Sequence, residues 1–266
     1  MKHLKKFYIF IILLFLYAPI VVLIVFSFNA SRSRANWTGF TFSWYLELFK
    51  DQRIINALNV TLTVALISSL IAVVLGTAAA IGINAMRPLG KKTFIAINNI
   101  PVINPDIVMG ISMMILFIFI FRFSPLKLEM GYLSLLLAHL SFNTPYVVLS
   151  VLPRLRHLDE NLYEAALDLG APPLKSFLHV IMPEISPGII TGALLAFTMS
   201  IDDFIVSFFT SGSGVENLSM VIYSMARRGV SPKINAISTL MFIFVITLLY
   251  LVNRIDTRNK EKETLS

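Results

Sequence analysis

The sequence predicts an all-α integral membrane protein with six transmembrane helices. Of its 266 residues, 56% are hydrophobic and 14% are charged, so one water-soluble core could not hide its apolar surface. The apolar residues also gather into runs near the ~20 residues that cross ~30 Å of hydrocarbon. These runs are Phe7–Phe28, Val60–Ile83, Phe94–Phe121, Tyr132–Leu152, Pro187–Phe209 and Ala236–Val252.

The first run follows the basic start Met1–Lys6 and could be mistaken for a signal peptide. It is longer than the apolar part of a typical signal peptide, and no Ala-x-Ala cleavage site follows it, so we predict a transmembrane helix. The next segment, Asn29–Asn59, mixes aromatic and polar residues. This mixture is typical of an interfacial aromatic belt or a short surface helix, with partner contact as the alternative.

The distribution of basic residues indicates that both termini are cytoplasmic. These residues lie at the ends of the apolar runs, so the net charge of +7 fits membrane topology better than nucleic-acid binding. The short connection Asn84–Thr93 carries Arg87, Lys91 and Lys92, as short cytoplasmic loops often do. With this orientation, residues 153–186 form a cytoplasmic loop.

The chain is predicted to hold one transmembrane domain, residues 1–253, and a charged cytoplasmic tail, residues 254–266. We find no internal repeat that would divide it. Zero cysteines exclude disulfides and thiolate metal ligands.

The cytoplasmic loop contains a segment, Glu164–Pro183, that is polar enough to be soluble although it lies between apolar spans. Its first part favours an amphipathic helix that ends at Gly170. Pro172-Pro173 then breaks the chain, and a second short helix would end at Pro183. Two short helices joined by a tight turn would fit a groove on a partner protein.

This segment resembles the EAA motif of the ABC importer permeases, the binding-protein-dependent inner-membrane family. The family pattern is E-A-A-x3-G-x9-I-x-L-P, and the chain matches it at Glu164, Ala165, Ala166, Gly170 and Pro183. It departs from the pattern in two mild apolar changes, at Val180 and Met182. An ordinary amphipathic surface helix is the alternative, since Ala, Leu and Glu are good helix formers.

The resemblance implies a MetI-like fold of the type I ABC importers, and a transport subunit rather than an enzyme. In that family the motif forms two coupling helices on a nucleotide-binding subunit. The residues implied in this docking are Glu164, Ala165, Ala166, Asp168, Gly170, Ala171 and Pro183. Because the chain has no G-x4-G-K-[ST] loop, ATP and Mg²⁺ would bind partner chains and this chain would hold no cofactor.

The implied partners are two ATP-binding cassette subunits, a second homologous permease and an extracytoplasmic binding protein, in the bacterial cytoplasmic membrane. Four further segments resemble the spermidine/putrescine permeases of the PotC type, which implies polyamine import by alternating access. These segments are Asn36–Phe40, Pro105–Met109, Asp202-Asp203 and Gly229–Pro232. The EAA motif says nothing about cargo, so another small solute or a metal cation is an alternative.

Three acidic residues fall within the predicted spans, Asp106 in the third and Asp202 and Asp203 in the fifth. A charged residue costs roughly 2.5 to 3.5 kcal/mol at the centre of a membrane helix, so these acids should face water, a cation or a partner. At ~1.5 Å per residue, Asp106 and Asp202 lie roughly 20 and 22 Å from the cytoplasmic ends of their spans. The sequence therefore predicts that the three acids line a cation pathway.

The stretch Asn99–Pro105 contains two prolines and should interrupt the third span, leaving carbonyls that must line a cavity. For Asp106, the alternatives to a pathway role are a helix N-cap after Pro105 and an outer-leaflet residue that reaches the membrane interface. Asp202 and Asp203 would point about 100° apart on a helix. One should face the pathway while the other pairs with a group such as Arg227 or Arg228.

Two other classes of function deserve comparison with a permease. An intramembrane enzyme could use paired acids, but Asp202 and Asp203 are adjacent on one helix and do not face one another. A secondary carrier would work without any ATPase subunit. His139 could indicate proton coupling, but we expect it to hydrogen-bond a neighbouring helix instead.

Overall fold

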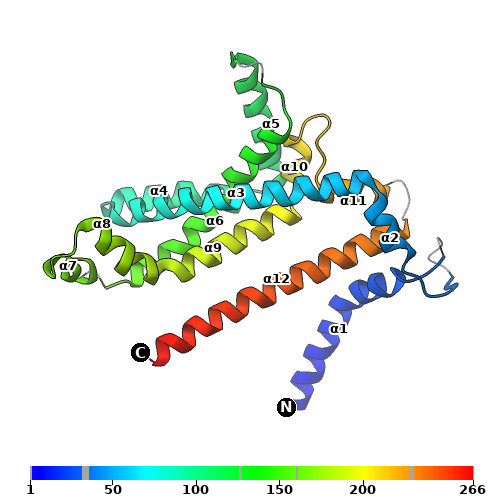
Figure 1. Cartoon of the computed structure of the whole chain (residues 1–266), viewed down its shortest axis with the longest axis horizontal. Helices are drawn as coiled ribbons and strands as arrows, with labels where there is room; N and C mark the ends of the chain where they lie inside the picture. The colour runs from blue at the N-terminus through cyan, green and yellow to red at the C-terminus, as the bar shows by residue number, and fades with distance from the viewer. Residues whose placement is uncertain (1, 32–35, 126–127, 160, 228–230, 266) are drawn as a thin grey trace. The chain divides into compact units, whose positions relative to one another are not determined.

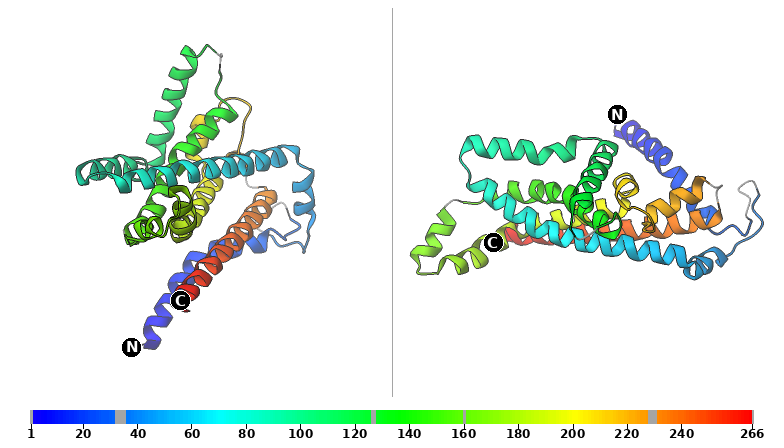
Figure 2. Two further views of the ribbon diagram at one scale, coloured as in Figure 1. Left: turned by 60° about the vertical axis from the view of Figure 1, so that its left-hand side comes forward. Right: turned by 90° about the horizontal axis from the view of Figure 1, so that it is seen from above.

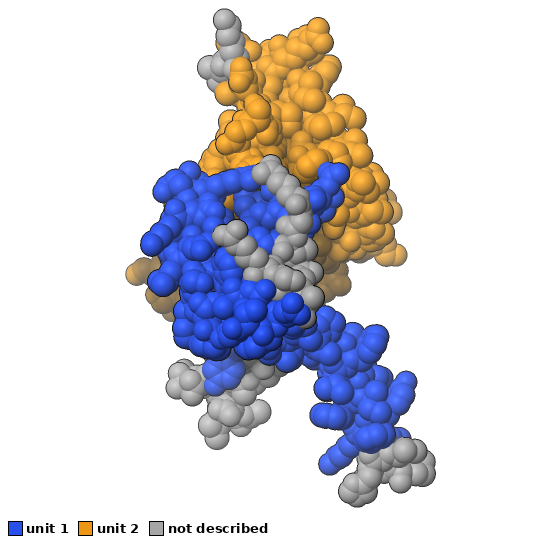
Figure 3. Space-filling view, turned by 90° about the vertical axis from the view of Figure 1, so that its right-hand side faces the viewer, with its two compact units in different colours: residues 1–56, 221–250 blue, residues 57–220, 251–266 orange. Residues whose placement is uncertain are grey.

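The computed structural model describes residues 2–31, 36–125, 128–159, 161–227 and 231–265, which are largely helical (Figure 1). Its helices are α1 (Lys2–Phe26), α2 (Ser43–Lys50), α3 (Gln52–Ala85), α4 (Pro88–Ile103), α5 (Asp106–Phe123), α6 (Tyr132–His157), α7 (Asn161–Asp168), α8 (Pro173–Ser176), the π turn η1 (Phe177–Ile181), α9 (Met182–Asp202), α10 (Ile205–Thr210), α11 (Leu218–Arg227) and α12 (Pro232–Leu265). The chain divides into two compact units, residues 1–56 with 221–250 and residues 57–220 with 251–266 (Figure 3).

Five of the described helical stretches are long and apolar enough to cross a membrane. They are Lys5–Phe26, Gln52–Ala85, Asp106–Phe123, Tyr132–His157 and Pro173–Asp202. The apolar part of α12, Pro232–Leu248, is shorter and overlaps the sixth predicted run. The all-helical membrane fold expected from the sequence is confirmed.

The third predicted span, Phe94–Phe121, is two helices that point in different directions. Helix α4 ends at Ile103, α5 begins at Asp106, and the chain turns sharply between them (Figures 1 and 2). Asn104 is extended, with φ −71° and ψ 142°, because the following proline disfavours the helical region. The predicted interruption is confirmed. However, α4 has only 16 residues, so α5 alone is long enough to span.

The fifth predicted span, Pro187–Phe209, is wrong at both ends. Helices α8 and α9 join through η1 into one helical stretch from Pro173 to Asp202. The chain then leaves the helix at Asp203, which is extended, and resumes as α10. The fifth span therefore starts within the EAA segment, the name used below for Glu164–Pro183, and ends at the first of the two adjacent acids.

Pro183 was predicted to end a short helix, and this prediction is also wrong. Pro183 lies in the first turn of α9 instead. A proline ring normally clashes with the carbonyl four residues earlier. In η1 the N–H of Met182 bonds the carbonyl of Phe177, five residues back, and this wider turn gives the ring room without ending the helix.

Helix α9 packs closely on α6 because four of its buried residues are small. Gly188, Gly192, Ala196 and Ser200 recur at every fourth position and are all buried. Small residues at this spacing allow two helix backbones to approach one another. A Cβ atom on Gly188 would lie 2.8 Å from the carbonyl oxygen of Ser150 in α6. We call these four residues the small-residue stripe.

Helix α3 joins the same core through contacts with both α6 and α9. A Cβ atom on Gly76 would lie 2.7 Å from the Cβ of Val147. Ala72, Ala80, Val147, Val151 and Ile185 belong to one buried hydrophobic cluster that α3, α6 and α9 share. A second cluster joins α5 to α10 and α6 through Met113, Phe117, Phe121, Ala138 and Val206.

The first unit contains the predicted surface helix as α2. Trp44 in α2 donates its indole N–H to the carbonyl of Asn29 at 2.8 Å, which fixes the helix on the loop before it. The rings of Phe28 and Phe40 stack with their centroids 5.1 Å apart. The aromatic residues of this segment therefore pack on one another, while Trp37 and Phe42 stay about half exposed.

We predict that Gly188→Ala destabilises the protein by about 1 to 3 kcal/mol, because the new methyl group would overlap a backbone carbonyl that cannot move aside. Thermal unfolding of the purified protein in detergent measures the effect as a lower Tm. Gly82→Ala is the matched control, since a Cβ there meets nothing within 4 Å and alanine favours the helix by about 1 kcal/mol. An equal Tm for the two variants would contradict the close contact between α9 and α6.

Candidate functional site

A cavity of about 360 Å³ lies where α4, α5, α6, α9 and α10 meet. Its wall combines acidic, aromatic and methionine side chains. The lining residues are Pro101, Asp106, Met109, Phe142, Tyr146, Met199, Asp202, Asp203, Phe204, Ile205 and Val206. The structure thus brings together all three acids that were expected to line a cation pathway.

Asp106 reaches the cavity from the beginning of α5. It is the first residue of this helix, the preceding Pro105 holds the N-cap position, and no side-chain cap hydrogen bond is present. The alternative of an N-cap role for Asp106 is therefore wrong. Its side chain is exposed, and an acid in the first turn interacts favourably with the helix dipole.

The structure separates the roles of the two adjacent acids. Asp202 is the last residue of α9 and is exposed. The side chain of Asp203 is only 10% exposed, and its carboxylate accepts hydrogen bonds from the backbone N–H groups of Val206 at 3.2 Å and Ser207 at 2.7 Å. The hydroxyl of Ser207 donates to the same carboxylate at 2.7 Å. Asp203 therefore caps α10, and Asp202 is the more exposed of the two acids that line the cavity.

One of the two acids, Asp203, has side-chain partners as expected, and those that the structure shows include Ser207 of α10. The suggested pairing with Arg227 or Arg228 stays a prediction. The guanidinium of Arg227 lies 5.9 Å from the ring centroid of Tyr223. Arg228, the other suggested partner, lies outside the described residues, as do Gly229 and Val230. The carboxylate is held by a helix N-terminus, which can satisfy a negative charge without a cation.

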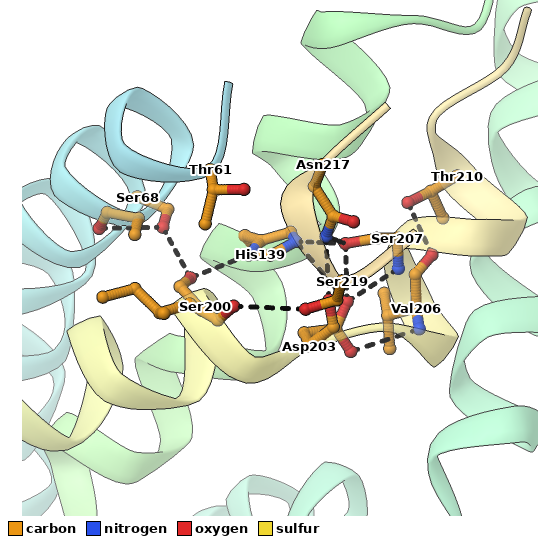
Figure 4. A network of polar contacts seen from close by, with 12 residues as sticks. Thr61, Ser68, His139, Ser200, Asp203, Val206, Ser207, Thr210, Asn217 and Ser219 are labelled. Carbon is orange, nitrogen blue, oxygen red and sulfur yellow. Dashed lines mark hydrogen bonds and ion pairs between the residues drawn. The ribbon is translucent and has the colours of Figure 1, made fainter. Parts of the chain in front are cut away.

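His139 connects α6 to α9 and α10 beside the cavity (Figure 4). Its Nδ1 lies 2.7 Å from the hydroxyl of Ser200, and its Nε2 lies 3.0 Å from the hydroxyl of Ser207 and 3.6 Å from Asp203 Oδ2. The side chain is 2% exposed. The prediction that His139 hydrogen-bonds neighbouring helices is confirmed.

The other members of this polar network were not predicted from the sequence. Asn143 donates from Nδ2 to Ser200 at 2.9 Å and to Ser68 of α3 at 3.1 Å. Asn217 donates to the hydroxyl of Ser207 at 2.7 Å and to the carbonyl of Asp203 at 2.8 Å. One signal could have found part of it, because His139 and Asn143 are four residues apart and share one face of α6.

The EAA segment has the predicted turn between its two helices. Helix α7 ends at Asp168, and Gly170 adopts φ +85°, a left-handed conformation that glycine adopts without strain. The N–H of Ala171 bonds the carbonyl of Ala166, and the N–H of Gly170 bonds that of Leu167. These two bonds form the Schellman motif that commonly ends a helix at glycine.

The EAA segment presents a mixed acidic and apolar surface. Glu164, Asp168 and Pro183 are exposed, as is Ala165. Leu169 is 90% exposed and Leu174 is 71% exposed. Exposed large apolar side chains gathered on a short segment mark a surface suited to protein contact.

Residues 72–260 match the family described as "Binding-protein-dependent transport system inner membrane component". The chain belongs to this family. The matched residues include the EAA segment and all three cavity acids. The protein is therefore a permease component of a transport system in the bacterial inner membrane, and not an enzyme.

Curated relatives of this permease cover most of its length. It is 40% identical over 228 residues to the putrescine transport system permease protein PotI of Escherichia coli. The aligned residues cover 85% of this chain and 81% of PotI. It is 35% identical over 256 residues to the spermidine/putrescine transport system permease protein PotC of Haemophilus influenzae, spanning 96% and 97% of the two chains. The resemblance to this group is confirmed.

Solved structures show the same fold at lower sequence identity. A bacterial ABC transporter that imports the acidic polysaccharide alginate superposes with a TM-score of 0.75 at 17% identity, over 97% of this permease and 94% of that chain. The MetNI methionine transporter superposes with a TM-score of 0.62 at 20% identity, over 77% and 95% of the two chains. The permease therefore has the predicted MetI-like fold.

Proposed function

We propose that this permease moves polyamines, putrescine or spermidine, through the bacterial cytoplasmic membrane by alternating access. The observation that carries the proposal is the cavity that places Asp106 and Asp202 among aromatic and methionine side chains. Polyamines are protonated amines joined by methylene groups, so they suit carboxylates set in such walls. The names of the relatives that it matches over most of its length support the same cargo.

The lining of the cavity favours an organic cation over the other cargoes considered. Two exposed carboxylates disfavour an anion. Metal cations prefer a full shell of oxygen or nitrogen ligands, whereas Phe142, Tyr146 and Phe204 contribute aromatic rings, which suit ammonium and methylene groups.

The EAA segment is the proposed docking surface for an ATP-binding cassette subunit. Glu164, Ala165, Ala166, Asp168, Gly170, Ala171 and Pro183 carry this role in the proposal, and the exposed Leu169 and Leu174 add apolar area. ATP and Mg²⁺ bind two such partner subunits. A second permease subunit and an extracytoplasmic polyamine-binding protein complete the transporter. A structural neighbour was solved with a pentasaccharide-bound periplasmic protein, which supports a binding protein as partner.

In this proposal both termini are cytoplasmic, residues 1–253 form the permease domain and residues 254–266 form a cytoplasmic tail. The helical stretch Pro173–Asp202 then links the docking surface to the cavity. It has 30 residues, or roughly 45 Å at 1.5 Å per residue. Closure of the ATP-binding subunits would push on its beginning and shift Asp202 at its end, which changes the side from which the cavity opens.

Asp202→Asn should lower polyamine uptake by about tenfold or more, because a charge-assisted contact with the cargo is lost. The measurement is uptake of labelled putrescine into proteoliposomes that hold the complete transporter. Glu129→Gln, which removes an exposed acid outside the cavity, should leave uptake unchanged. Asp203→Asn should instead lower the free energy of unfolding by about 1 to 3 kcal/mol, seen as a lower Tm, since it weakens the cap of α10. Wild-type uptake by Asp202→Asn would remove this residue from the pathway.

Glu164→Lys should prevent docking of the ATP-binding subunit, because it reverses an exposed charge on the proposed contact surface. Co-purification of the ATP-binding subunit with tagged permease measures the effect, together with the ATPase rate of the complex. The control is Glu129→Lys, the same reversal on the loop between α5 and α6. Full ATPase recovery with Glu164→Lys would show that the docking surface lies elsewhere.

A further inference from the structure

We propose that His139 is a positioning residue for the cargo cavity, and that it acts through the hydroxyl of Ser207. It does not line the cavity itself. Instead it holds the break between α9 and α10, where Asp202 is presented. This inference rests on the proposed function of the cavity.

The hydrogen bonds at Ser207 fix where the proton of His139 lies. A serine hydroxyl donates one hydrogen bond and accepts two. The hydroxyl of Ser207 donates to Asp203 Oδ2 at 2.7 Å. Asn217 Nδ2 at 2.7 Å and His139 Nε2 at 3.0 Å must therefore donate to it. His139 thus carries a proton on Nε2.

The second ring nitrogen, Nδ1, connects His139 to α9 and, through Ser200, to α3. In the neutral ring Nδ1 is an acceptor, so it takes the proton of the Ser200 hydroxyl at 2.7 Å. The oxygen of Ser200 then accepts from Asn143 Nδ2 at 2.9 Å and from Ser68 at 3.1 Å. The donor direction is therefore the same along the chain of bonds, from Ser200 to His139, then to Ser207 and to Asp203. Figure 4 shows these contacts.

This chain of bonds ends at the backbone of the break. A helix end leaves N–H and carbonyl groups without partners, and such groups are costly at membrane depth. The carboxylate of Asp203 binds the N–H groups of Val206 and Ser207, while Asn217 binds the carbonyl of Asp203. Ser207 is the point where Asp203, Asn217 and His139 meet. His139 therefore fixes from α6 the geometry that aims Asp202.

His139 also supports the wall of the cavity. Its ring lies 5.0 Å, centroid to centroid, from that of Phe142, which lines the cavity. A substitution at His139 would therefore affect Phe142 in the cavity wall as well as Ser207 at the break. The connection of His139 to the break is through Nε2, which bonds Ser207 at 3.0 Å and lies 3.6 Å from Asp203 Oδ2.

Two substitutions separate the bond to Ser207 from the bond to Ser200. The amide of glutamine reaches the place of Nε2 and can donate to Ser207, whereas the shorter asparagine reaches only the place of Nδ1. We expect His139→Asn to lower the amount of putrescine moved per ATP hydrolysed by about tenfold, the effect of one lost buried hydrogen bond. His139→Gln should stay within about threefold of wild type.

The measurement uses the complete transporter in proteoliposomes, with labelled putrescine, the ATPase rate and the Tm recorded for each variant. In a Ser207→Ala background, His139→Asn should cause no further loss, because the partner through which it acts is gone. Equal putrescine transport per ATP for the Asn and Gln variants would overturn the proposal. The proposal would also be overturned if putrescine transport per ATP fell in both variants in proportion to a lower Tm. That result is expected of a histidine with a purely structural role.

A measurement without cargo keeps this inference separate from the proposed function. The ¹⁵N chemical shifts of histidine-labelled protein distinguish the two tautomers, and the His139→Gln spectrum identifies the signal of His139. The proposal predicts that His139 in the wild-type protein carries its proton on Nε2 and not on Nδ1. The signal of this histidine should be absent from the His139→Gln spectrum. An Nδ1–H tautomer would overturn it whatever the cargo. Absent polyamine transport with the Nε2–H tautomer present would refute the cargo and leave the arrangement of bonds standing.

Discussion

The close contact between α9 and α6 is the interaction on which the rest of the site depends. It is possible because the small-residue stripe, Gly188, Gly192, Ala196 and Ser200, allows the two backbones to meet. The stripe ends in a hydroxyl group, so the apolar packing continues directly into the polar network around His139. A larger side chain in the stripe would therefore act on the cavity as well as on stability.

Both exposed cavity acids lie at helix ends and not in the middle of a span. Asp106 begins α5 after a proline break, and Asp202 ends α9 before an extended residue. Irregular backbone at membrane depth is tolerated where it is buried in protein or lines a cavity, and here each break is placed beside the same cavity. Asp203 satisfies the N-terminus of α10, which explains how two adjacent acids can have different roles.

The sequence predicted the features that depend on local chemistry. Apolar runs predicted where the long apolar helices lie, although not all of their ends. Gly170 predicted the turn of the EAA segment, and Pro105 predicted the break before α5. The failures have long-range or compensated causes. Pro183 does not end its helix because a π turn accommodates it. The break at Asp203 could not be predicted because no proline or glycine lies beside it. The network of His139 joins residues far apart in the chain, so only the folded arrangement of α3, α6, α9 and α10 reveals it.

The central claim is that this permease carries polyamines through the cavity of Asp106 and Asp202. The most direct test is ATP-dependent uptake of labelled putrescine and spermidine by the complete transporter, in a host without other polyamine import, with and without this chain. The account predicts uptake that requires the chain. An assembled complex that hydrolyses ATP and imports neither polyamine would contradict the claim about cargo, while uptake that persists without the chain would contradict its role as the permease.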